Sequence, residues 1–343
     1  MASLTPRCSP GELAGLLEAL DVRIESALVE RHSVSLPDYP GGPRPSSVVR
    51  LSGGGCSGWG ENVAFHEQDH QRFAANIERW FAARAASAPS AVRSALGAEG
   101  TPYERAALEA ALIDLALRQA GLSLYDLSGV PEASLRFVQS LAADPDPQAV
   151  IGRLRKEGFH GELKVDVDPS WGEFVLESLA HEPGIAIFDF KGRGDASFAR
   201  RLGAACASAL FEDPPAGFEA PNRAPRSRVS RDASLLDERA VAAALARGEA
   251  VNLKAPRMGG PLAVLRGLQH AWAGKQLDSP PSAYLGGMFE TNVGRAQARQ
   301  LAALYCASAP NDLALNVANA AGPRERSESP AQIRLDQPGF GSP

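Results

Sequence analysis

In the second half of the chain, short apolar runs alternate with amphipathic segments, and five of these runs end on a charged residue. The five charges are Lys164, Asp189, Glu212, Asp232 and Lys254. Successive charges lie 25, 23, 20 and 22 residues apart, about the length of one strand and one helix. Because parallel strands joined by helices bring their carboxyl ends to one edge, we expect these five side chains to gather there.

The same alternation predicts the elements from Ser134 onward. We expect strands over Leu135–Ser140, Gly161–Val167, Ile185–Phe190, Ala209–Glu212, Val229–Asp232, Ala250–Lys254 and Ala283–Leu285. Helices are expected between them, over Pro147–Glu157, Trp171–Ala180, Ser197–Ala207, Glu238–Ala246, Gly260–Ala273 and Gly294–Leu304. About eight strands in all, with no glycine-rich nucleotide turn, favour an α/β fold with a parallel barrel over an open sheet.

The first part of the chain has a different pattern. Alternation predicts an antiparallel meander over Val22–Leu36, Ser47–Leu51 and Cys56–Glu61, and the loop Pro37–Pro45 interrupts it. Helical spacing is seen over Gly11–Leu20, Glu67–Ala86 and Tyr103–Ala120, the last starting at Thr101-Pro102 and stopping at Gly121. We therefore expect an α+β domain over 1–132, a barrel domain over 133–311, and a tail, 312–343, that packs on the first domain or frays.

Composition narrows the partners. The chain has 343 residues and a net charge of −5, which gives no reason to expect nucleic acid or an anionic membrane. No apolar stretch approaches the roughly 20 residues that span a bilayer, and residues 1–11 lack the pattern of a secretory signal. Four scattered cysteines are typical of free thiols in a reducing compartment, so we expect a cytoplasmic protein. The sequence leaves open whether the protein forms a homo-oligomer.

Three carboxylates at consecutive strand ends predict a metal site. Asp189, Glu212 and Asp232 offer hard oxygen ligands, which favour Mg²⁺, with Mn²⁺ as the alternative. Lys164 and Lys254 come from the strands on either side of this set, and a partly desolvated lysine near a divalent cation can act as a neutral base. The competing interpretation is that these are ordinary strand-end charges and paired lysines.

At this point the chain resembles the enolase superfamily, in its muconate-lactonising and o-succinylbenzoate synthase-like branch. The resemblance runs from about Val22 to Asp312 and is carried by Gly58-Trp59-Gly60-Glu61-Asn62, Glu104–Leu117, Leu163-Lys164-Val165, Phe211-Glu212-Asp213-Pro214, Asn252-Leu253-Lys254 through Gly260, and Gly286-Gly287-Met288-Phe289-Glu290-Thr291. It implies a capping domain, a (β/α)₇β barrel, and one Mg²⁺ held by the three carboxylates.

The resemblance also implies an enzyme that abstracts a proton α to a carboxylate and forms an enediolate. Lys164 is the expected base, and Lys254 either supplies a proton to the other face or stays protonated and stabilises the intermediate. For a small carboxylic-acid substrate, the expected outcome is β-elimination, as in an o-succinylbenzoate synthase-like dehydratase. The alternatives are an N-acylamino acid racemase or epimerase, a muconate-type cycloisomerase, and a non-catalytic relative.

Departures from the family pattern affect the substrate. Glu162 stands where the family often has a first lysine, and Lys191 stands where asparagine is frequent. Lys191 pairs with a metal ligand, binds a substrate anion or points to solvent. Glu290 either orients Lys254 or contacts substrate. Tyr39 and Arg44, in a loop over the barrel mouth, are further candidates for substrate contact or ordinary surface residues.

Overall fold

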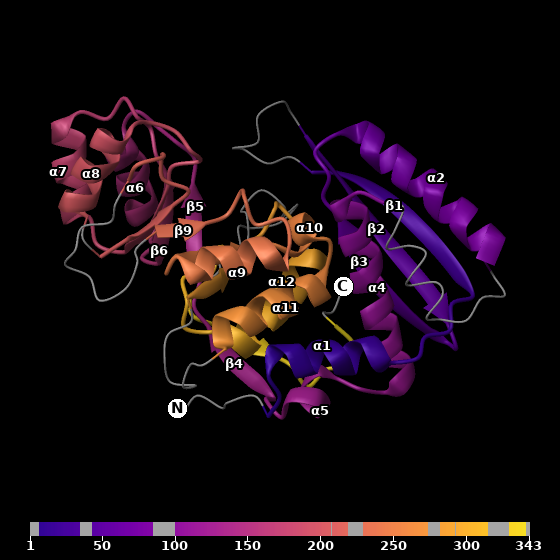
Figure 1. The fold of residues 1–343 in the computed structure, drawn as a ribbon. Helices are drawn as coiled ribbons and strands as arrows, with labels where there is room; N and C mark the ends of the chain where they lie inside the picture. Colours follow the sequence, from indigo (N-terminus) through magenta and orange to yellow (C-terminus); the bar gives the residue numbers. More distant parts are fainter. Residues whose placement is uncertain are drawn as a thin grey trace.

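The computed structural model describes residues 7–34, 43–84, 100–206, 208–218, 229–273, 282–291, 293–314 and 329–340. A three-stranded sheet with its helices forms a cap at one end of the molecule, in indigo and purple in Figure 1. A curled seven-stranded parallel sheet, in magenta to yellow, forms the rest. The predicted α/β class, with a barrel-like parallel sheet and an N-terminal cap, is confirmed.

The cap sheet is antiparallel in the order β1 (Ser26–Val34), β2 (Arg44–Gly53) and β3 (Cys56–Asn62). Its predicted meander is therefore correct, but β2 begins at Arg44 inside the expected Pro/Gly loop. Pro45 is tolerated because it pairs with Ser33 of β1 beyond the end of β3, which reaches only as far as Ser47.

Helix α4 (Pro102–Ala120) lies directly on β3. Thr101 and Glu104 form a capping box at its start, and Gly121 ends it in the left-handed conformation, as the sequence predicts. Gly58 and Gly60 of β3 permit the close approach, because a Cβ at either position would fall on the α4 backbone. The other helices among the described residues of this part are α1 (Pro10–Ala19), α2 (Glu67–Arg84) and α5 (Leu124–Ser128).

The parallel sheet supplies the site. Its strands follow chain order: β5 (Val138–Leu141), β6 (Glu162–Asp166), β7 (Ile185–Asp189), β8 (Leu210–Glu212), β9 (Val229–Arg231), β10 (Ala250–Leu253) and β11 (Ala283–Leu285). The helices that join or follow them are α6 (Pro147–Lys156), α7 (Glu173–His181), α8 (Ala196–Ala205), α9 (Glu238–Ala246), α10 (Ala255–Met258), α11 (Pro261–Trp272) and α12 (Val293–Tyr305).

The edges of this sheet are joined by two residues instead of a full strand. Asn311 bridges to Phe137, next to β5, and Asp312 bridges to Gly286, next to β11. The Asn311 side chain holds this connection: its amide donates to the carbonyl oxygens of Arg136, Cys306 and Ala309. The barrel thus closes through a segment too short to show a strand pattern.

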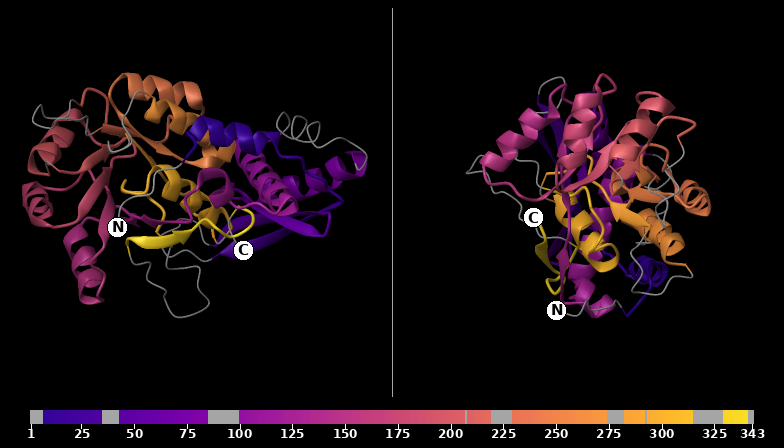
Figure 2. Two further views of the ribbon diagram at one scale, coloured as in Figure 1. Left: turned by 90° about the horizontal axis from the view of Figure 1, so that it is seen from below. Right: turned by 90° about the vertical axis from the view of Figure 1, so that its left-hand side faces the viewer.

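The expected strand Leu135–Ser140 is divided. Its first part belongs to β4 (Glu132–Leu135), which pairs with β12 (Ala331–Arg334), the yellow strand of Figure 2, and only the second part joins the barrel. Beyond β12, Leu335 and Phe340 are fully buried, and the Phe340 N–H donates to Asp114 of α4 at 2.6 Å. This end of the chain is therefore packed against the cap.

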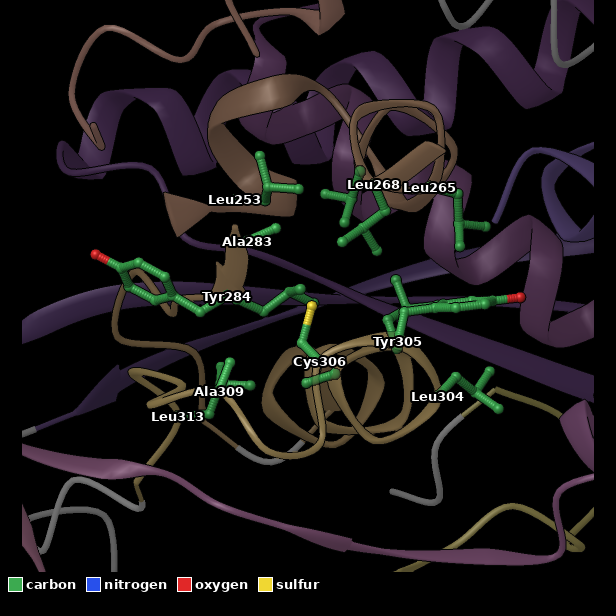
Figure 3. Packing of buried hydrophobic residues seen from close by; sticks show 14 of the residues in the cluster. Leu253, Leu265, Leu268, Ala283, Tyr284, Leu304, Tyr305, Cys306, Ala309 and Leu313 are labelled. Carbon is green, nitrogen blue, oxygen red and sulfur yellow. The ribbon is translucent and has the colours of Figure 1, made fainter. Parts of the chain in front are cut away.

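Apolar side chains between the sheet and its helices form the core. One cluster, partly drawn in Figure 3, joins β10, β11, α11 and α12 to α1, whose Leu13, Ala14 and Leu17 are buried. A second lies behind β6–β8, where Phe188, Phe190 and Phe211 pack at 5.9–6.1 Å between ring centroids. No described helix has the length and apolar character needed to cross a membrane.

Candidate active site

Lys164 lies at the centre of the barrel mouth, among three carboxylates. Its Nζ is 2.6 Å from Glu212 Oε1, 3.0 Å from Asp189 Oδ2 and 3.1 Å from Asp312 Oδ2. Only 3% of its side chain is exposed. Alternation along β6 explains this placement, since Leu163 and Val165 point outward into the core and Lys164 points inward.

Lys254 follows β10 and lies with Asp232, which follows β9. Its Nζ donates to Asp232 Oδ2 at 2.8 Å, and Arg257 pairs with the other oxygen of the same carboxylate. All three side chains are at least four-fifths buried. Arg257 belongs to the short helix α10, so the turn that follows the strand supplies this second cation.

The two groups form one electrostatic cluster. Burial, the largest influence, raises the pKa of Glu212; Lys164 and Lys254 oppose this, while Asp189 and Asp232 add to it. Burial alone would lower the pKa of Lys164, but Asp312, Glu212 and Asp189 together hold it well above its ordinary value. The pKa of Lys254 is likewise raised, against burial, mainly by Asp232. The five predicted residues therefore lie in two neighbouring groups of contacts that influence one another's charge.

The second oxygen of Glu212 faces the inside of the barrel. Tyr284 of β11 donates its hydroxyl to Glu212 Oε2, and Asn252 Nδ2 lies 3.2 Å from the same oxygen. Ser230 Oγ lies 2.9 Å from the Tyr284 hydroxyl. Tyr284 and Ser230 do not stand out in the sequence, and Asn252 does so only as part of the motif that leads to Lys254. The one available signal is that a tyrosine inside a buried strand needs a partner for its hydroxyl.

Asp189, Glu212 and Asp232 are the type of ligand that suits a magnesium ion, but the three carboxylates do not converge on one point. Asp189 and Glu212 share the Lys164 ammonium, which stands in for a cation between them. Asp232 instead turns to Lys254 and Arg257. Among the described residues, no three carboxylate, histidine or cysteine side chains are grouped as a metal site. The ligands are all carboxylate oxygens, the type Mg²⁺ prefers, and metal binding would require them to exchange partners.

Asp312 is a site residue that the sequence analysis placed at the start of the tail. It reaches the mouth because Asn311 and Asp312 close the barrel. Besides contacting Lys164, its Oδ1 accepts a hydrogen bond from Ser140 Oγ at 2.5 Å. Burial alone would raise its pKa, but Lys164 and Lys254 hold the pKa of Asp312 far below its ordinary value. It is thus a fourth carboxylate of the cluster, and the two lysines favour its ionised form.

The two departures from the family pattern have partners outside the central cluster. Glu162 forms a two-pronged pair with Arg136, at 2.5 and 2.7 Å, near the start of β6. Lys191 pairs with Asp166, and its backbone N–H donates to Asp189 Oδ1 at 3.0 Å. The Lys191 side chain is half exposed, so its ammonium fixes the rim of the mouth instead of joining the central cluster.

The expected substrate contacts from the cap and from β11 have other partners. Glu290 accepts the Met288 N–H at 2.8 Å and lies 3.7 Å from Arg295; in the described structure no hydrogen bond joins it to Lys254. Arg44 is buried, donates to the carbonyl oxygens of Val63 and Met288, and packs over the rings of Phe65 and Phe289. Tyr39 lies outside the described residues.

Three non-glycine residues just past the barrel strands adopt left-handed backbone angles. They are Lys191 (φ 50°), Asp213 (φ 44°) and Phe289 (φ 69°), after β7, β8 and β11. Such residues are strained relative to glycine and cluster at functional sites. Asp213 shows how the turn is fixed, because its carboxylate accepts the N–H groups of Asp232 and Ala233 at 3.1 and 2.8 Å.

Comparison with known proteins agrees with the fold described above. The chain is 28% identical over 290 residues, 78% of its length and 77% of the relative's, to an N-succinylamino acid racemase of Thermus thermophilus. An enolase superfamily member of unknown function from Enterococcus faecalis superposes with a TM-score of 0.71 at 21% identity, covering 94% of each chain. A dipeptide epimerase of Methylococcus capsulatus, in complex with Mg²⁺, gives 0.71 at 20% identity over 93% and 99% of the chains.

These structures confirm the predicted fold, which the chain shares with enolase superfamily members. Two family models match the chain itself: the N-terminal domain of DUF8230, a domain of unknown function, over residues 15–127, and its C-terminal domain over residues 131–320. The C-terminal match alone spans more than half of the sequence. The chain therefore belongs to the DUF8230 family, built on the enolase-superfamily fold.

Proposed function

We propose that this protein is an enzyme that transfers a proton at the carbon α to a carboxylate, in a small N-acylated amino acid or similar acid. The observation that carries the proposal is the pair of buried amines, Lys164 and Lys254, that share one carboxylate cluster at the barrel mouth. The similarity to a racemase and an epimerase makes inversion at the α-carbon the favoured outcome.

The lysines supply the proton transfers. One amine takes the α-proton, the electron pair of the broken C–H bond moves into the carboxylate, and an enediolate results. The ammonium on the opposite side then gives a proton to the other face of the same carbon. Asp189, Glu212 and Asp232 would hold Mg²⁺, and these carboxylates would then no longer be paired with the lysines that they now keep protonated. The bound ion would offset the negative charge that grows on the substrate.

β-Elimination is the second candidate. Arg257 places another cation beside Lys254 and Asp232. A face with two cations suits stabilisation of negative charge better than proton abstraction, and elimination needs only one base. In that case Lys164 would take the proton and Lys254 would stay protonated while a β-leaving group departs.

Proton exchange in deuterium oxide tests the proposal. Each enantiomer of several N-succinylamino acids is incubated with protein and Mg²⁺, with and without chelator, and followed by NMR and optical rotation. We expect deuterium at the α-carbon and loss of rotation with wild type, and neither with chelator. Lys164→Met should lose exchange from one enantiomer and Lys254→Met from the other, because each amine serves one face.

The exposed Lys156 of α6 provides a matched control, and Lys156→Met should keep full exchange. An unsaturated product would favour elimination over inversion. Exchange with neither enantiomer of any acid tested, or exchange that survives the loss of both amines, would contradict the proposal.

A further inference from the structure

Glu212 has hydrogen-bond partners on both of its carboxylate oxygens, and Lys164 is only one of them. Oε1 lies at the mouth, 2.6 Å from Lys164 Nζ, and Oε2 is directed into the barrel. The side chain is fully buried, so it has no solvent to satisfy either oxygen. Whatever donates to Oε2 therefore decides how the carboxylate is oriented.

Tyr284 is the main donor. It is 1% exposed and lies at the edge of the apolar cluster of Figure 3, with its hydroxyl directed away from that cluster. The hydroxyl donates to Glu212 Oε2 and meets Ser230 Oγ at 2.9 Å. Burial and the nearby Glu212 charge raise the pKa of Tyr284 well above its ordinary value, so the phenol keeps its proton.

Asn252 supports the same orientation. Its Nδ2 lies 3.2 Å from Glu212 Oε2, while its own Oδ1 is buried and has no hydrogen-bond partner in the described structure. A buried amide oxygen without a partner is unfavourable. The amide is therefore oriented with its nitrogen toward Glu212, and this orientation leaves its oxygen without a hydrogen bond.

We propose that Tyr284, seated against Ser230, is a positioning residue that keeps one oxygen of Glu212 inside the barrel and leaves a single oxygen at the mouth. This inference rests on the proposed function, in which Glu212 binds Mg²⁺. A ligand restricted to one oxygen suits the small octahedral Mg²⁺, whereas Ca²⁺ accepts carboxylates through both oxygens. Tyr284 accordingly sets both metal affinity and the preference for Mg²⁺ over Ca²⁺.

Calorimetric titration of Mg²⁺ and Ca²⁺ into metal-free protein tests this, with Tyr284→Phe as the variant. Loss of groups that orient metal ligands weakens binding by about 10–100-fold. We expect the Kd for Mg²⁺ to rise by about that factor and the Kd for Ca²⁺ to rise several-fold less. The matched control is Tyr305→Phe, since Tyr305 is also buried and its hydroxyl, on the opposite side of Figure 3, donates to the Cys8 carbonyl at 3.2 Å.

The outcomes separate the two proposals. Wild-type affinity in Tyr284→Phe would overturn the positioning role alone, and so would an equal loss of Mg²⁺ and Ca²⁺ affinity. Absence of Mg²⁺ binding in wild type would overturn the metal part of the proposed function and this inference with it. If Tyr284→Phe melts well below Tyr305→Phe, Ser230→Ala replaces it, and an unchanged Mg²⁺ affinity there would also contradict the role.

Discussion

At the scale of the residue, the candidate site depends on which atoms pack against the two lysine side chains. Gly286 follows β11 and lies against Lys254, and a Cβ built at position 286 would sit 2.6 Å from Lys254 Cε and collide with the Asn252 amide. The backbone at Gly286 does not adopt a left-handed conformation. The need for glycine there is thus steric and concerns the path of the lysine side chain.

Gly286→Ala should therefore impair chemistry more than stability. We expect proton exchange to fall at least about tenfold, because a displacement near 1 Å at a reacting group is worth up to about 10²-fold. Gly152→Ala in α6, where an added Cβ meets nothing within 4 Å, is the control and should keep full activity. Unchanged exchange rates in Gly286→Ala would show that Lys254 has more freedom than the structure indicates.

Five candidate site residues are visible in the sequence because each ends an apolar run, and the barrel topology alone brings strand ends together. Asp312, Asn252 and Tyr284 are not visible in this way. Asp312 arrives through a two-residue bridge, and the other two matter only through Glu212, a neighbour from another strand. Their roles depend on contacts between side chains that are far apart in the sequence, and a local sequence pattern does not predict such contacts.

At the scale of the element, strands with buried runs were predicted well and strands with weak patterns were not. Barrel strands such as β7 and β10 are mostly apolar and buried, and they lie where expected. In contrast, β12 is only half buried on one face, and β4 differs from β5 only by the partner it pairs with. The division at Arg136 follows from tertiary pairing, which the local alternation of Leu135–Ser140 does not contain.

Glu249 shows how one residue joins two elements. It immediately precedes β10, and it accepts two hydrogen bonds from Arg231 of β9 and two from Arg247, which follows α9, at 2.7–3.1 Å. Burial alone would raise its pKa, but the two arginines lower the pKa of Glu249 below its ordinary value. The carboxylate therefore stabilises the β9–α9–β10 unit while it is ionised.

Glu249→Gln should lower the free energy of unfolding by about 1 kcal/mol at pH 7, a modest value because Arg247 is half exposed. Because the pKa is lower in the folded state, this contribution is complete above the unfolded pKa of about 4.3 and is lost as pH falls through the folded pKa. Urea unfolding at pH 7 and near pH 3 measures it, with exposed Glu238→Gln as the control. A difference that persists undiminished in acid would contradict the assignment.

At the scale of the whole molecule, Glu61 connects the cap to the barrel. This residue of β3 is buried, and it accepts hydrogen bonds from Ser46 Oγ, from the N–H and hydroxyl of Thr291, and from the Gly294 N–H, at 2.7–3.0 Å. Thr291 lies in the loop that begins at Gly286, and Gly294 lies in the first turn of α12. The cap thereby holds the end of the same loop whose first residue, Gly286, contacts Lys254.

Glu61→Gln would place an amide N–H₂ among these donors. We expect a loss of about 1–3 kcal/mol of stability, the usual penalty for an unmatched buried polar group. Hydrogen exchange should rise in peptides covering 286–305 and stay unchanged in α1. Glu67→Gln, which removes an exposed pair with Arg31, should alter neither. Equal protection of 286–305 in both variants would mean that the cap does not restrain this loop.

The left-handed turns after β7, β8 and β11 also bear on how such a protein can be altered. Each of the three side-chain-bearing residues there raises the free energy of the native backbone by about 1–3 kcal/mol. A laboratory selection for heat resistance alone should accumulate glycine or asparagine at Phe289, whereas Asp213 should stay because its carboxylate accepts two backbone N–H groups. A selection for turnover should retain Phe289 as well, so the two kinds of library would diverge first at this position on the rim of the barrel.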